Sequence, residues 1–368
     1  MENKTIRVGI IGVDVNRGWA SMAHIPALQS LPQFKITALS SRTKEKATAA
    51  GEKFGIEHTF DNDHDLVTSR EIDLVVITVK VPYHKELVTA ALHAGKKVYC
   101  EWPLGNGLEE AVMLDELARE KNIYAVTGLQ TQSIPAINYI RDLIKEGYVG
   151  EVLSTSMIAS GGFAEVDQAN AYTMDQKNGA SMLSIVLGAT VHAVCYCLGE
   201  FKELTAVTAT QRKNIVIADT GTSIPVTIAD QISISGIMEN EVIAAIHFRA
   251  GASRGTNFLW EINGTEGNLQ ITADGGHIGF YPVTIKGGKG TDKVMAELPV
   301  PEEYNWVNDE APKGPAFHVA QHYTRVAKDI HEGTKLCSTF EDAVVRHRMI
   351  NAIETAAASG TKQSYLVF

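Results

Sequence analysis

A turn that could hold a phosphate group follows the first apolar run of the sequence. Residues 6–11 (IRVGII) lead into Gly12, and Gly18 stands just before a stretch with helical spacing. A helix that begins beside small residues can bind a pyrophosphate through free backbone N–H groups and its dipole. Five residues rather than four separate the outer glycines, and the middle glycine of G-x-G-x-x-G is absent, so a purely structural strand–turn–helix corner is the alternative. The residues expected to contact a cofactor here are Gly12, Asn16, Arg17, Gly18 and Trp19.

The end of the second expected strand carries hydroxyl and guanidinium groups instead of an acidic side chain. Residues 40–43 read Ser-Ser-Arg-Thr. Sites that prefer NAD usually place Asp or Glu here, where the carboxylate binds the ribose 2′-hydroxyl. Ser41 and Arg42 suit a 2′-phosphate instead, because a phosphate accepts several charge-assisted hydrogen bonds. The sequence therefore favours NADP(H) over NAD(H), and a helix N-cap at Ser41 or Thr43 is compatible with this interpretation.

The elements that position these residues alternate regularly over the first third of the chain. Apolar runs alternate with helical stretches, which indicates a parallel sheet of the Rossmann type over 1–130. Residues 72–79 (IDLVVITV) form the most continuous apolar run, as a strand buried on both faces requires. Ligands of such sheets bind at the carboxyl ends of the strands. The expected strands are 6–11, 34–39, 58–60, 72–79, 97–101 and 123–128, and the expected helices are 20–31, 43–54, 83–94 and 108–121.

After Glu151 the pattern changes to strand-like stretches separated by turn signals. Few helices intervene, which indicates an open, mostly antiparallel sheet in an α+β domain over 131–368, whose last helices could pack back on the first domain. Residues 286–290 (KGGKG) are expected to be a mobile loop. The expected strands are 152–158, 205–210, 230–238, 242–248, 259–262 and 268–271, and the expected helices are 180–198, 315–332 and 340–358.

Several motifs recur in a fixed order along essentially the whole chain. They are Gly12…Gly18-Trp-Ala, Val79-Lys-Val-Pro-Tyr-His84, Glu101-Trp-Pro103, Gly128-Leu-Gln130, Gly161-Gly162, Gly264-Thr-Glu-Gly-Asn-Leu269 and Thr339-Phe-Glu-Asp-Ala343. Together they resemble the glucose–fructose oxidoreductase/inositol dehydrogenase (Gfo/Idh/MocA) family, and within it the Gal80-like branch. The resemblance implies a Rossmann domain, a C-terminal domain with an open sheet, and homodimers or homotetramers formed through that sheet. Typical members are NAD(P)-dependent dehydrogenases or reductases of sugars, polyols and related carbonyl compounds.

The motif loops at the expected strand ends are predicted to complete the cofactor site. Their residues are Val79, Lys80, Pro82, His84, Glu101, Trp102 and Gln130.

The catalytic residues that the resemblance implies do not carry over to this chain. The family's Glu-Lys-Pro motif reads Glu-Trp-Pro at 101–103. An indole cannot exchange protons at neutral pH, although it can stack on a nicotinamide or sugar face. The family's Asp, and the His four residues later on one helix, fall on Ile185 and Ala189, or on Val186 and Thr190 after a slip of one residue.

Other side chains could supply the proton that hydride transfer to a carbonyl requires. Lys80 stands at the carboxyl end of the best expected strand, and His192 lies about one helical turn beyond the vacated position. The predicted catalytic residues are Lys80, His192 and Tyr172, with His84 as a weaker candidate. The alternatives are that Lys80 only binds cofactor hydroxyls and that His192 is a satisfied core residue.

Three further polar patterns are interpreted as structural. His318 and His322 are spaced as zinc ligands can be, but no acidic motif completes a site, so we expect a solvated or substrate-facing helix surface and no metal. Residues 346–348 (RHR) are expected to form a solvated basic patch. The four cysteines are too few and too scattered for a disulfide framework, which predicts a reducing, cytoplasmic compartment.

Composition argues against several classes of partner. Lys and Arg number 33 and Asp and Glu number 43, for a formal net charge of −10. An acidic chain is a poor ligand for nucleic acid or for an anionic membrane in bulk. No run approaches the ~18 apolar residues of a membrane span, and the first residues do not resemble a secretory signal.

These features predict an NADP(H)-dependent oxidoreductase of a sugar-like or other small carbonyl or alcohol substrate, with an atypical acid–base set. A Gal80-like dinucleotide-binding sensor without turnover is one alternative, and a non-redox enzyme that reuses the cofactor pocket is another. Loss of the family's Lys, Asp and His favours the two alternatives, whereas the lack of a long insertion for a protein partner disfavours the sensor.

Overall fold

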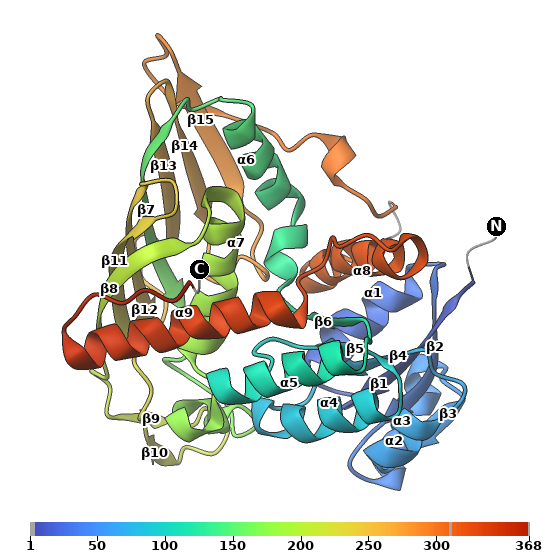
Figure 1. The fold of residues 1–368 in the computed structure, drawn as a ribbon. Coiled ribbons are helices and arrows are strands. Elements are labelled where there is room, and N and C mark those ends of the chain that lie inside the picture. Colours follow the sequence, from blue (N-terminus) through green and yellow to red (C-terminus); the bar gives the residue numbers. More distant parts are fainter. Residues whose placement is uncertain (1–3, 309–310, 367–368) are drawn as a thin grey trace. The chain divides into compact units, whose positions relative to one another are not determined.

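The chain folds into two compact units, each built around its own large sheet (Figure 1). The computed structural model describes residues 4–308 and 311–366. The first unit comprises Met1–Ser133 with Asn305–Val344, and the second comprises Ile134–Tyr304 with Val345–Phe368. The predicted fold class, a Rossmann sheet followed by a mostly antiparallel sheet, is confirmed.

The strands of the first sheet run parallel in the order β3-β2-β1-β4-β5-β6. The direction of winding reverses between β1 and β4, which is where doubly wound sheets bind dinucleotides. All four residues of β4 are buried and apolar, as a central parallel strand requires. The strands are β1 (Ile6–Ile11), β2 (Phe34–Ser40), β3 (His58–Phe60), β4 (Leu74–Ile77), β5 (Lys97–Cys100) and β6 (Ala125–Thr127).

The helices of the first unit fall where the apolar spacing predicted them, with two differences. The helix expected at 20–31 begins as a π-helical turn, Ala20–His24, and ends at Gln29, and the short helix α3 was not predicted. The helices are α1 (Ile25–Gln29), α2 (Lys44–Phe54), α3 (Asp63–Thr68), α4 (His84–His93), α5 (Leu108–Glu120) and α8 (Pro315–Glu332).

Helix α8 packs into the core of the first unit, although the sequence boundary at residue 130 assigned it to the second domain. Its apolar face buries Val319, Tyr323 and Val326 in the same cluster as Val8 and Ile10 of β1. Removal of these side chains from water is the force that holds the helix there. The sequence prediction left this possibility open, because it allowed the last helices to pack back on the first domain.

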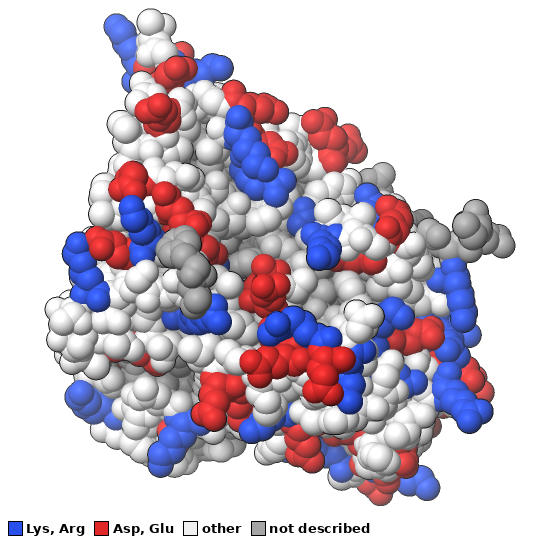
Figure 2. Space-filling model, in the orientation of Figure 1, with Lys and Arg blue, Asp and Glu red and all other residues white. Residues whose placement is uncertain are grey.

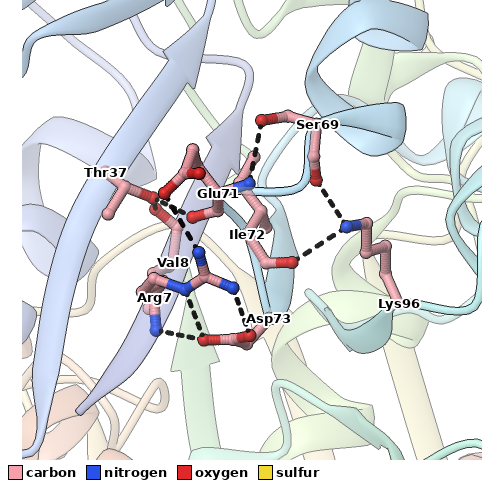
Figure 3. A network of polar contacts seen from close by, with 8 residues as sticks. All are labelled: Arg7, Val8, Thr37, Ser69, Glu71, Ile72, Asp73 and Lys96. Carbon is pink, nitrogen blue, oxygen red and sulfur yellow. Dashed lines mark hydrogen bonds and ion pairs between the residues drawn. The ribbon is translucent and has the colours of Figure 1, made fainter.

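A network of charged side chains joins β1 to the segment before β4 at the amino-terminal edge of the sheet (Figure 3). Arg7 donates hydrogen bonds to the carboxylate of Asp73 at 2.8 to 3.0 Å and to Glu71 at 3.0 Å. Lys96 donates to two backbone carbonyls of the same segment at 2.5 and 2.9 Å. The hydrogen bonds that Asp73 accepts from Arg7 lower the pKa of Asp73 to about 2. The network fixes this segment at the edge opposite the loops that follow the strands.

Asp73→Asn is expected to remove part of the acid dependence of stability. A carboxyl whose pKa is about 2 in the folded chain and about 3.9 in the unfolded chain stabilises the fold fully above about pH 5. That contribution is lost as the pH falls toward 2, so the Tm of the wild type should fall more steeply over this range than that of Asp73→Asn. Glu71→Gln is the matched control, because Glu71 also contacts Arg7 but its side chain is 60% exposed. Equal slopes for wild type and Asp73→Asn would contradict the prediction.

The second unit contains an eight-stranded mixed sheet with the order β16-β15-β14-β13-β7-β12-β11-β8. β7 and β12 run parallel, and the other neighbouring pairs are antiparallel. Its strands are β7 (Val152–Gly161), β8 (Phe201–Ala209), β11 (Gln231–Met238), β12 (Ile243–Ala250), β13 (Phe258–Gly264), β14 (Gly267–Ala273), β15 (Thr284–Lys289) and β16 (Ala296–Glu297), and a separate ribbon pairs β9 (Asn214–Val216) with β10 (Ser223–Pro225).

Helices α6 (Pro135–Lys145) and α7 (Gly188–Leu198) pack side by side in this unit (Figure 1). Helix α6 was not predicted, and the helix expected at 180–198 begins with a π-helical turn, Met182–Leu187. Helix α9 (Phe340–Ser359) supplies residues to both units.

Two expectations for polar segments of this unit are wrong. Residues 286–290 are not a loop, because most of them belong to β15, which pairs with β14. A Cβ on Gly287 would lie 2.7 Å from the hydroxyl of Tyr148, so close packing explains that glycine better than mobility does. Residues 346–348 are not a solvated patch, because Arg346 and His347 are 1% and 3% exposed.

Charged side chains of both signs are interspersed over the face of the molecule shown in Figure 2. Within residues 4–308 and 311–366, no helix combines the length and apolar character that a membrane crossing requires.

Candidate functional site

The loops that the sequence analysis singled out lie at one edge of the first unit's sheet. Because the strands are parallel, the residues that follow β1, β2, β4, β5 and β6 all emerge at the carboxyl edge. The structure therefore gathers there every residue predicted to bind a cofactor, and their contact with one stays a prediction. These residues are Gly12, Asn16, Arg17, Gly18, Trp19, Ser41, Arg42, Val79, Lys80, Pro82, His84, Glu101, Trp102 and Gln130.

The turn after β1 has no room for a side chain at its first residue. Gly12 has φ +96°, in the region that only glycine adopts without strain. A Cβ there would lie 2.7 Å from Cγ1 of Val79. Val13 N donates to the last carbonyl of β2 at 3.1 Å, and Thr78 Oγ1 donates to the last carbonyl of β1 at 2.7 Å. The ends of β1, β2 and β4 are thus tied together at this turn.

The rest of this loop is held by Asp14 and leaves Gly18 beside open space. Asp14 accepts a hydrogen bond from the backbone N of Asn16 at 3.1 Å, and its carboxylate lies 3.9 Å from Nε of Arg17. Gly18 has φ +92°, and a Cβ on it would meet no atom within 4 Å. A glycine backbone that faces open space can be approached closely by phosphate oxygens.

At the end of β2 the hydroxyl groups of Ser40 and Thr43 are already engaged, and the guanidinium of Arg42 is exposed. Ser40 Oγ donates to Asp63 at 2.6 Å, and Ser41 is 8% exposed. Thr43 caps α2 by accepting a hydrogen bond from the backbone N of Lys46 at 3.3 Å. The capping alternative therefore holds for Thr43, and the Arg42 side chain is exposed to solvent.

His84 joins two of the loops from within the protein. It is 1% exposed, with Nε2 2.9 Å from the carbonyl of Val79 and Nδ1 2.8 Å from the carbonyl of Pro103. Burial lowers the pKa of His84, which favours the neutral ring, and a neutral ring donates its single N–H to only one of these two carbonyls. Cys100 Sγ lies 3.4 Å from Nδ1. The ring holds the loop after β4 against the loop after β5, which explains a buried histidine here without direct contact to a cofactor.

Glu101 is the centre of a hydrogen-bond network that crosses the sheet edge. Its Oε1 lies 2.8 Å from Nε2 of His24 and 2.7 Å from Nε2 of Gln130. Gln130 also donates to the hydroxyl of Tyr99 at 2.9 Å, and Nδ1 of His24 lies 2.7 Å from the hydroxyl of Tyr323. The Glu101 side chain is 14% exposed, whereas His24 is fully buried. One carboxylate is therefore positioned by two donors from different segments, His24 and Gln130, which are themselves bonded to Tyr323 and Tyr99.

The chemistry of the partners assigns the protons in this network. A carboxylate only accepts, so Nε2 of His24 carries the hydrogen that Glu101 receives. Nδ1 of a neutral ring then accepts from Tyr323. Burial raises the pKa of Tyr323 well above its usual value, which keeps this hydroxyl protonated as a donor. Carboxylate oxygens at the edge of the sheet can also receive hydrogen bonds from sugar hydroxyls.

Gly128, which follows β6, lies so close to the Glu101 carboxylate that no side chain would fit at this position. A Cβ on Gly128 would lie 2.6 Å from both carboxylate oxygens of Glu101. Trp102, the next residue after Glu101, is 7% exposed, and the Trp102–Pro103 peptide bond is cis. Trp19 packs edge-on against His24 with ring centroids 6.4 Å apart.

Sequence reasoning missed the positioning residues of this network, His24, Tyr99 and Tyr323. A signal existed for His24, since a histidine inside the apolar stretch ASMAHIPAL must find a partner when the helix is buried. Tyr99 and Tyr323 carried no comparable signal, because an apolar strand and an amphipathic helix both accept a buried tyrosine.

The three predicted catalytic residues lie on both units. Lys80 is half-buried in the first, at the start of the turn Val81–Tyr83. Tyr172 is half-buried in the turn Ala171–Met174 of the second, where burial raises its pKa. His192 lies on α7, and burial, aided by the charge of Arg346, lowers its pKa to about 3. A ring with that pKa is neutral at pH 7 and cannot serve as a cationic acid.

Helix α7 carries no acid or base at the positions that the resemblance implies. Ile185 lies in the π-helical turn before it, and Ala189 is 7% exposed. Thr190 is fully buried and donates from Oγ1 to the carbonyl of Gly276 at 2.7 Å. If the family's histidine is instead aligned one residue later, it falls on Thr190, whose hydroxyl is already used in this structural hydrogen bond.

His318 and His322 do not behave as a metal pair. His322 is fully buried, and its Nδ1 lies 2.9 Å from Oγ of Ser133, so the expected solvated or substrate-facing surface is wrong for this residue. Over the part of the chain that the structure describes, no group of three or more His, Cys, Asp and Glu side chains could hold a metal ion.

The residues at the carboxyl edge fit a dinucleotide. The backbone at Gly18 borders open space as a phosphate site requires, and the Gly12 turn brings β1 close to the loop after β4. Glu101 offers a fixed acceptor for ribose or substrate hydroxyls. This fit concerns the first unit by itself.

Comparisons with known proteins match both parts of the chain. Residues 6–128 match the oxidoreductase family with an NAD-binding Rossmann fold, Gfo/Idh/MocA. Residues 135–273 match the C-terminal domain of Gal80p. The chain is 29% identical over 378 residues to dehydrogenase aclE of Aspergillus oryzae, with 99% of each chain covered.

Solved structures share the fold over nearly the full length. The super-repressor mutant of Gal80p from Saccharomyces cerevisiae superimposes with a TM-score of 0.87 at 23% identity, covering 98% of this chain and 97% of that one. Levoglucosan dehydrogenase in complex with NADH and L-sorbose gives 0.85 at 20% identity, covering 98% and 99%. At such identities the likeness shows the fold alone, whereas the matches above extend to sequence. Residues 6–128 are therefore similar to the NAD-binding Rossmann domain of the Gfo/Idh/MocA oxidoreductase family, and residues 135–273 are similar to the C-terminal domain of Gal80p.

Proposed function

We propose that this protein is an NAD(P)(H)-dependent oxidoreductase of a sugar-like or other small carbonyl or alcohol substrate. The observation that carries the proposal is the Glu101 carboxylate, fixed by His24 and Gln130 at the carboxyl edge of a Rossmann sheet. A relative that spans 99% of the chain is named a dehydrogenase, and levoglucosan dehydrogenase has been solved with NADH and a sugar, which supports the same reading.

Each loop at the carboxyl edge has a part in binding the cofactor. The backbone between Gly12 and Gly18 holds the pyrophosphate, and Ser41 with Arg42 holds a ribose 2′-phosphate, so NADP(H) is preferred over NAD(H). Glu101 accepts hydrogen bonds from sugar hydroxyls, and the Trp102 indole provides a stacking face. The bound nicotinamide supplies the hydride chemistry, and the protein supplies orientation and the proton.

Arg42→Ala tests the cofactor preference. A charge-assisted hydrogen bond to the 2′-phosphate contributes about 1.5–3 kcal/mol, so the variant should bind NADPH roughly 10- to 100-fold more weakly. NADH affinity should hardly change, since NADH lacks that phosphate. Fluorescence titration of the wild type and the variant with both cofactors gives the four dissociation constants. Lys35→Ala, an exposed cation near the amino-terminal end of β2, is the control for a general loss of positive charge. An equal loss for NADPH and NADH would refute the 2′-phosphate role.

Turnover is tested by the absorbance of the reduced nicotinamide. The wild type is incubated with NADP⁺ or NAD⁺ and a panel of sugars and polyols, and with NADPH or NADH and a panel of carbonyl compounds. A substrate-dependent change at a rate proportional to enzyme supports the oxidoreductase. Tight cofactor binding with no change across both panels would overturn it, and failure to bind either cofactor would overturn every cofactor-based proposal.

A sensor without turnover is the second candidate function. The absence of titratable groups at Ile185 and Ala189 and the Gal80p-type C-terminal domain favour it. Such a protein would bind the dinucleotide and change its affinity for a protein partner. The turnover assay separates the two functions, because the sensor gives cofactor binding without absorbance change. A non-redox enzyme would instead convert a substrate with no net change in the nicotinamide.

A homodimer or homotetramer forms, in this proposal, through the outer face of the eight-stranded sheet. Val207, Ile243 and Ile158 on this face are 71%, 52% and 41% exposed, and Val207 and Ile158 share one cross-strand row. Exposed apolar residues of this kind mark protein contact surfaces. The molar mass from light scattering tests the proposal, and a monomer would refute it.

A further inference from the structure

We propose that Asp14, in the loop after β1, is a specificity-determining residue that discriminates between the ribose groups of the two cofactors. Its carboxylate accepts a hydrogen bond from the 2′-hydroxyl of NAD(H) and repels the 2′-phosphate of NADP(H). Asp14 thereby limits the preference for NADP(H) and keeps NAD(H) usable. The inference deepens the cofactor site proposed above and rests on it, and every residue that it uses lies in the first unit.

Backbone hydrogen bonds place Asp14 against the end of β2. Val13 N, the amide before it, donates at 3.1 Å to the carbonyl of Ser40, which is the last residue of β2. The carbonyl of Asp14 itself accepts a hydrogen bond from the hydroxyl of Ser21 in the π-helical turn. In Rossmann folds the ribose 2′ position is recognised at the end of the second strand, next to the phosphate-binding turn. Asp14 therefore lies where the ribose of a bound dinucleotide is expected.

Two lysines of α2 contact the same loop. Nζ of Lys46 lies 3.8 Å from a carboxylate oxygen of Asp14, and Lys53 donates a hydrogen bond to the carbonyl of Val15. Lys46 is in the first turn of α2, where its backbone N is capped by Thr43. The contact between Asp14 and Lys46 therefore joins the loop after β1 to the start of α2, which directly follows the residues predicted to hold a 2′-phosphate.

The carboxylate of Asp14 is shared by two cations. Nε of Arg17 lies 3.9 Å from the same oxygen that faces Lys46, and the backbone N of Asn16 donates to the other oxygen at 3.1 Å. The Asp14 side chain is 29% exposed, whereas the side chains of Arg17 and Lys46 are 63% and 53% exposed. A ligand can therefore reach the carboxylate and both cations, and the cations belong to long side chains that can turn toward a new partner.

The two cofactors use this arrangement differently. The 2′-hydroxyl of NAD(H) donates a hydrogen bond, which a carboxylate accepts and a cation cannot. The 2′-phosphate of NADP(H) is an anion, so it takes Lys46 and Arg17 as partners and leaves Asp14 facing a second negative charge. Ion pairs this exposed contribute little to stability, so the exchange of partners costs the fold little. The repulsion between the two anions remains, and it lowers the affinity for NADP(H).

Asp14 also accounts for the lack of an acidic residue at the end of β2. Residues 40–43 read Ser-Ser-Arg-Thr, where a site for NAD usually has Asp or Glu. Asp14 supplies a carboxylate at that corner from a different segment, at the place in the loop where the middle glycine of G-x-G-x-x-G is absent. The loop therefore has, instead of a glycine, a side chain that can discriminate between the two ribose substituents.

Asp14→Asn is the test, because asparagine keeps an oxygen that can accept from Asn16 N but removes the charge. By fluorescence titration, the variant should bind NADPH about 3- to 10-fold more tightly than the wild type and NADH about 3- to 10-fold more weakly, with unchanged Tm. Lys46→Ala should weaken NADPH binding about 10-fold and leave NADH binding nearly unchanged. Glu52→Gln, which removes an exposed carboxylate elsewhere on α2, is the matched control and should keep both dissociation constants.

A second readout needs neither the nicotinamide nor turnover. Calorimetric titration of Asp14→Asn should give a higher affinity than that of the wild type for adenosine 2′,5′-bisphosphate. The same variant should give a lower affinity for adenosine 5′-monophosphate, which has a free 2′-hydroxyl. The two probes differ in the 2′ substituent alone, so opposite changes assign the effect of Asp14 to that position.

The outcomes separate this inference from the proposed function. A wild type that binds neither cofactor would overturn the proposed function and the inference with it. If the wild type binds cofactor but Asp14→Asn leaves the ratio of the NADPH and NADH dissociation constants unchanged, the inference alone is wrong. A lower Tm with an equal loss of both affinities would show a purely structural role for Asp14 and would also overturn it.

Discussion

Arg346→Met is expected to destabilise the folded chain by about 3–5 kcal/mol, because it leaves a largely buried carboxylate without its partner. Arg346 is 1% exposed, and its guanidinium donates to the two oxygens of Glu200 at 2.5 and 3.1 Å. Burial alone would raise the pKa of Glu200, but Arg346 holds it below its usual value. Glu200 also accepts a hydrogen bond from the hydroxyl of Tyr365 at 2.6 Å. The loss is measured by urea unfolding followed by tryptophan fluorescence and by circular dichroism.

Further variants show whether the ion pair itself is responsible. The double variant Arg346→Met with Glu200→Gln should be much less destabilised than the sum of the two single changes, since no unpaired charge remains. Arg346→Lys, which keeps the charge but not the two-pronged geometry, should lie between the wild type and Arg346→Met. Tyr365→Phe should cost about 1 kcal/mol. An Arg346→Met protein as stable as the wild type would refute the prediction.

Gly12→Ala is expected to weaken NADPH binding at least tenfold and to lower Tm. The left-handed backbone at φ +96° costs an alanine about 1–2 kcal/mol, and the added methyl would lie 2.7 Å from Val79 Cγ1. To avoid this overlap, the turn after β1 or the loop after β4 must move. Such overpacking lowers the stability by about a further 1–3 kcal/mol. Both loops belong to the predicted cofactor site, so affinity and stability should fall together. Fluorescence titration with NADPH and thermal unfolding measure the two effects.

Gly55→Ala separates the strain of the backbone from the collision. Gly55 ends α2 with φ +68°, and a Cβ there would meet no atom within 4 Å. This variant should lose about 1 kcal/mol of stability and keep its NADPH affinity. If Gly12→Ala bound NADPH as tightly as Gly55→Ala does, the loop after β1 would not form part of the cofactor site.

Local pattern was sufficient for the Rossmann sheet, because burial on both faces demands continuous apolar runs such as 72–79. Prediction from local pattern was wrong for a segment whose strand structure depends on pairing with a neighbouring strand. Residues 286–290 look like a flexible tract, yet the ladder with β14 and the close approach of Tyr148 hold them as a strand. Helix α6 was missed altogether, although its apolar residues are buried.

The sequence predicted which loops form the candidate site, but it did not predict the hydrogen bonds that connect them. Parallel strands bring their carboxyl ends to one edge, so loops far apart in the sequence could be grouped from strand order. The bonds of His24 to Glu101 and to Tyr323 span 77 and 299 residues. Pairings at such separations depend on how α8 packs, and no local pattern encodes that.

The sequence by itself determined which chemical groups stand at the strand ends and that the family's Lys, Asp and His are missing. It could not decide which polar groups are solvated. Arg346 and His322 were assigned to exposed helix faces, and the tertiary structure buries both beside hydrogen-bond partners. It also joins Gly276, on the loop between β14 and β15, to α7 by a hydrogen bond from Thr190. The reason is physical: apolar periodicity and turn geometry are properties of neighbouring residues, whereas burial, satisfied hydrogen bonds and pKa shifts exist only once distant segments have packed together.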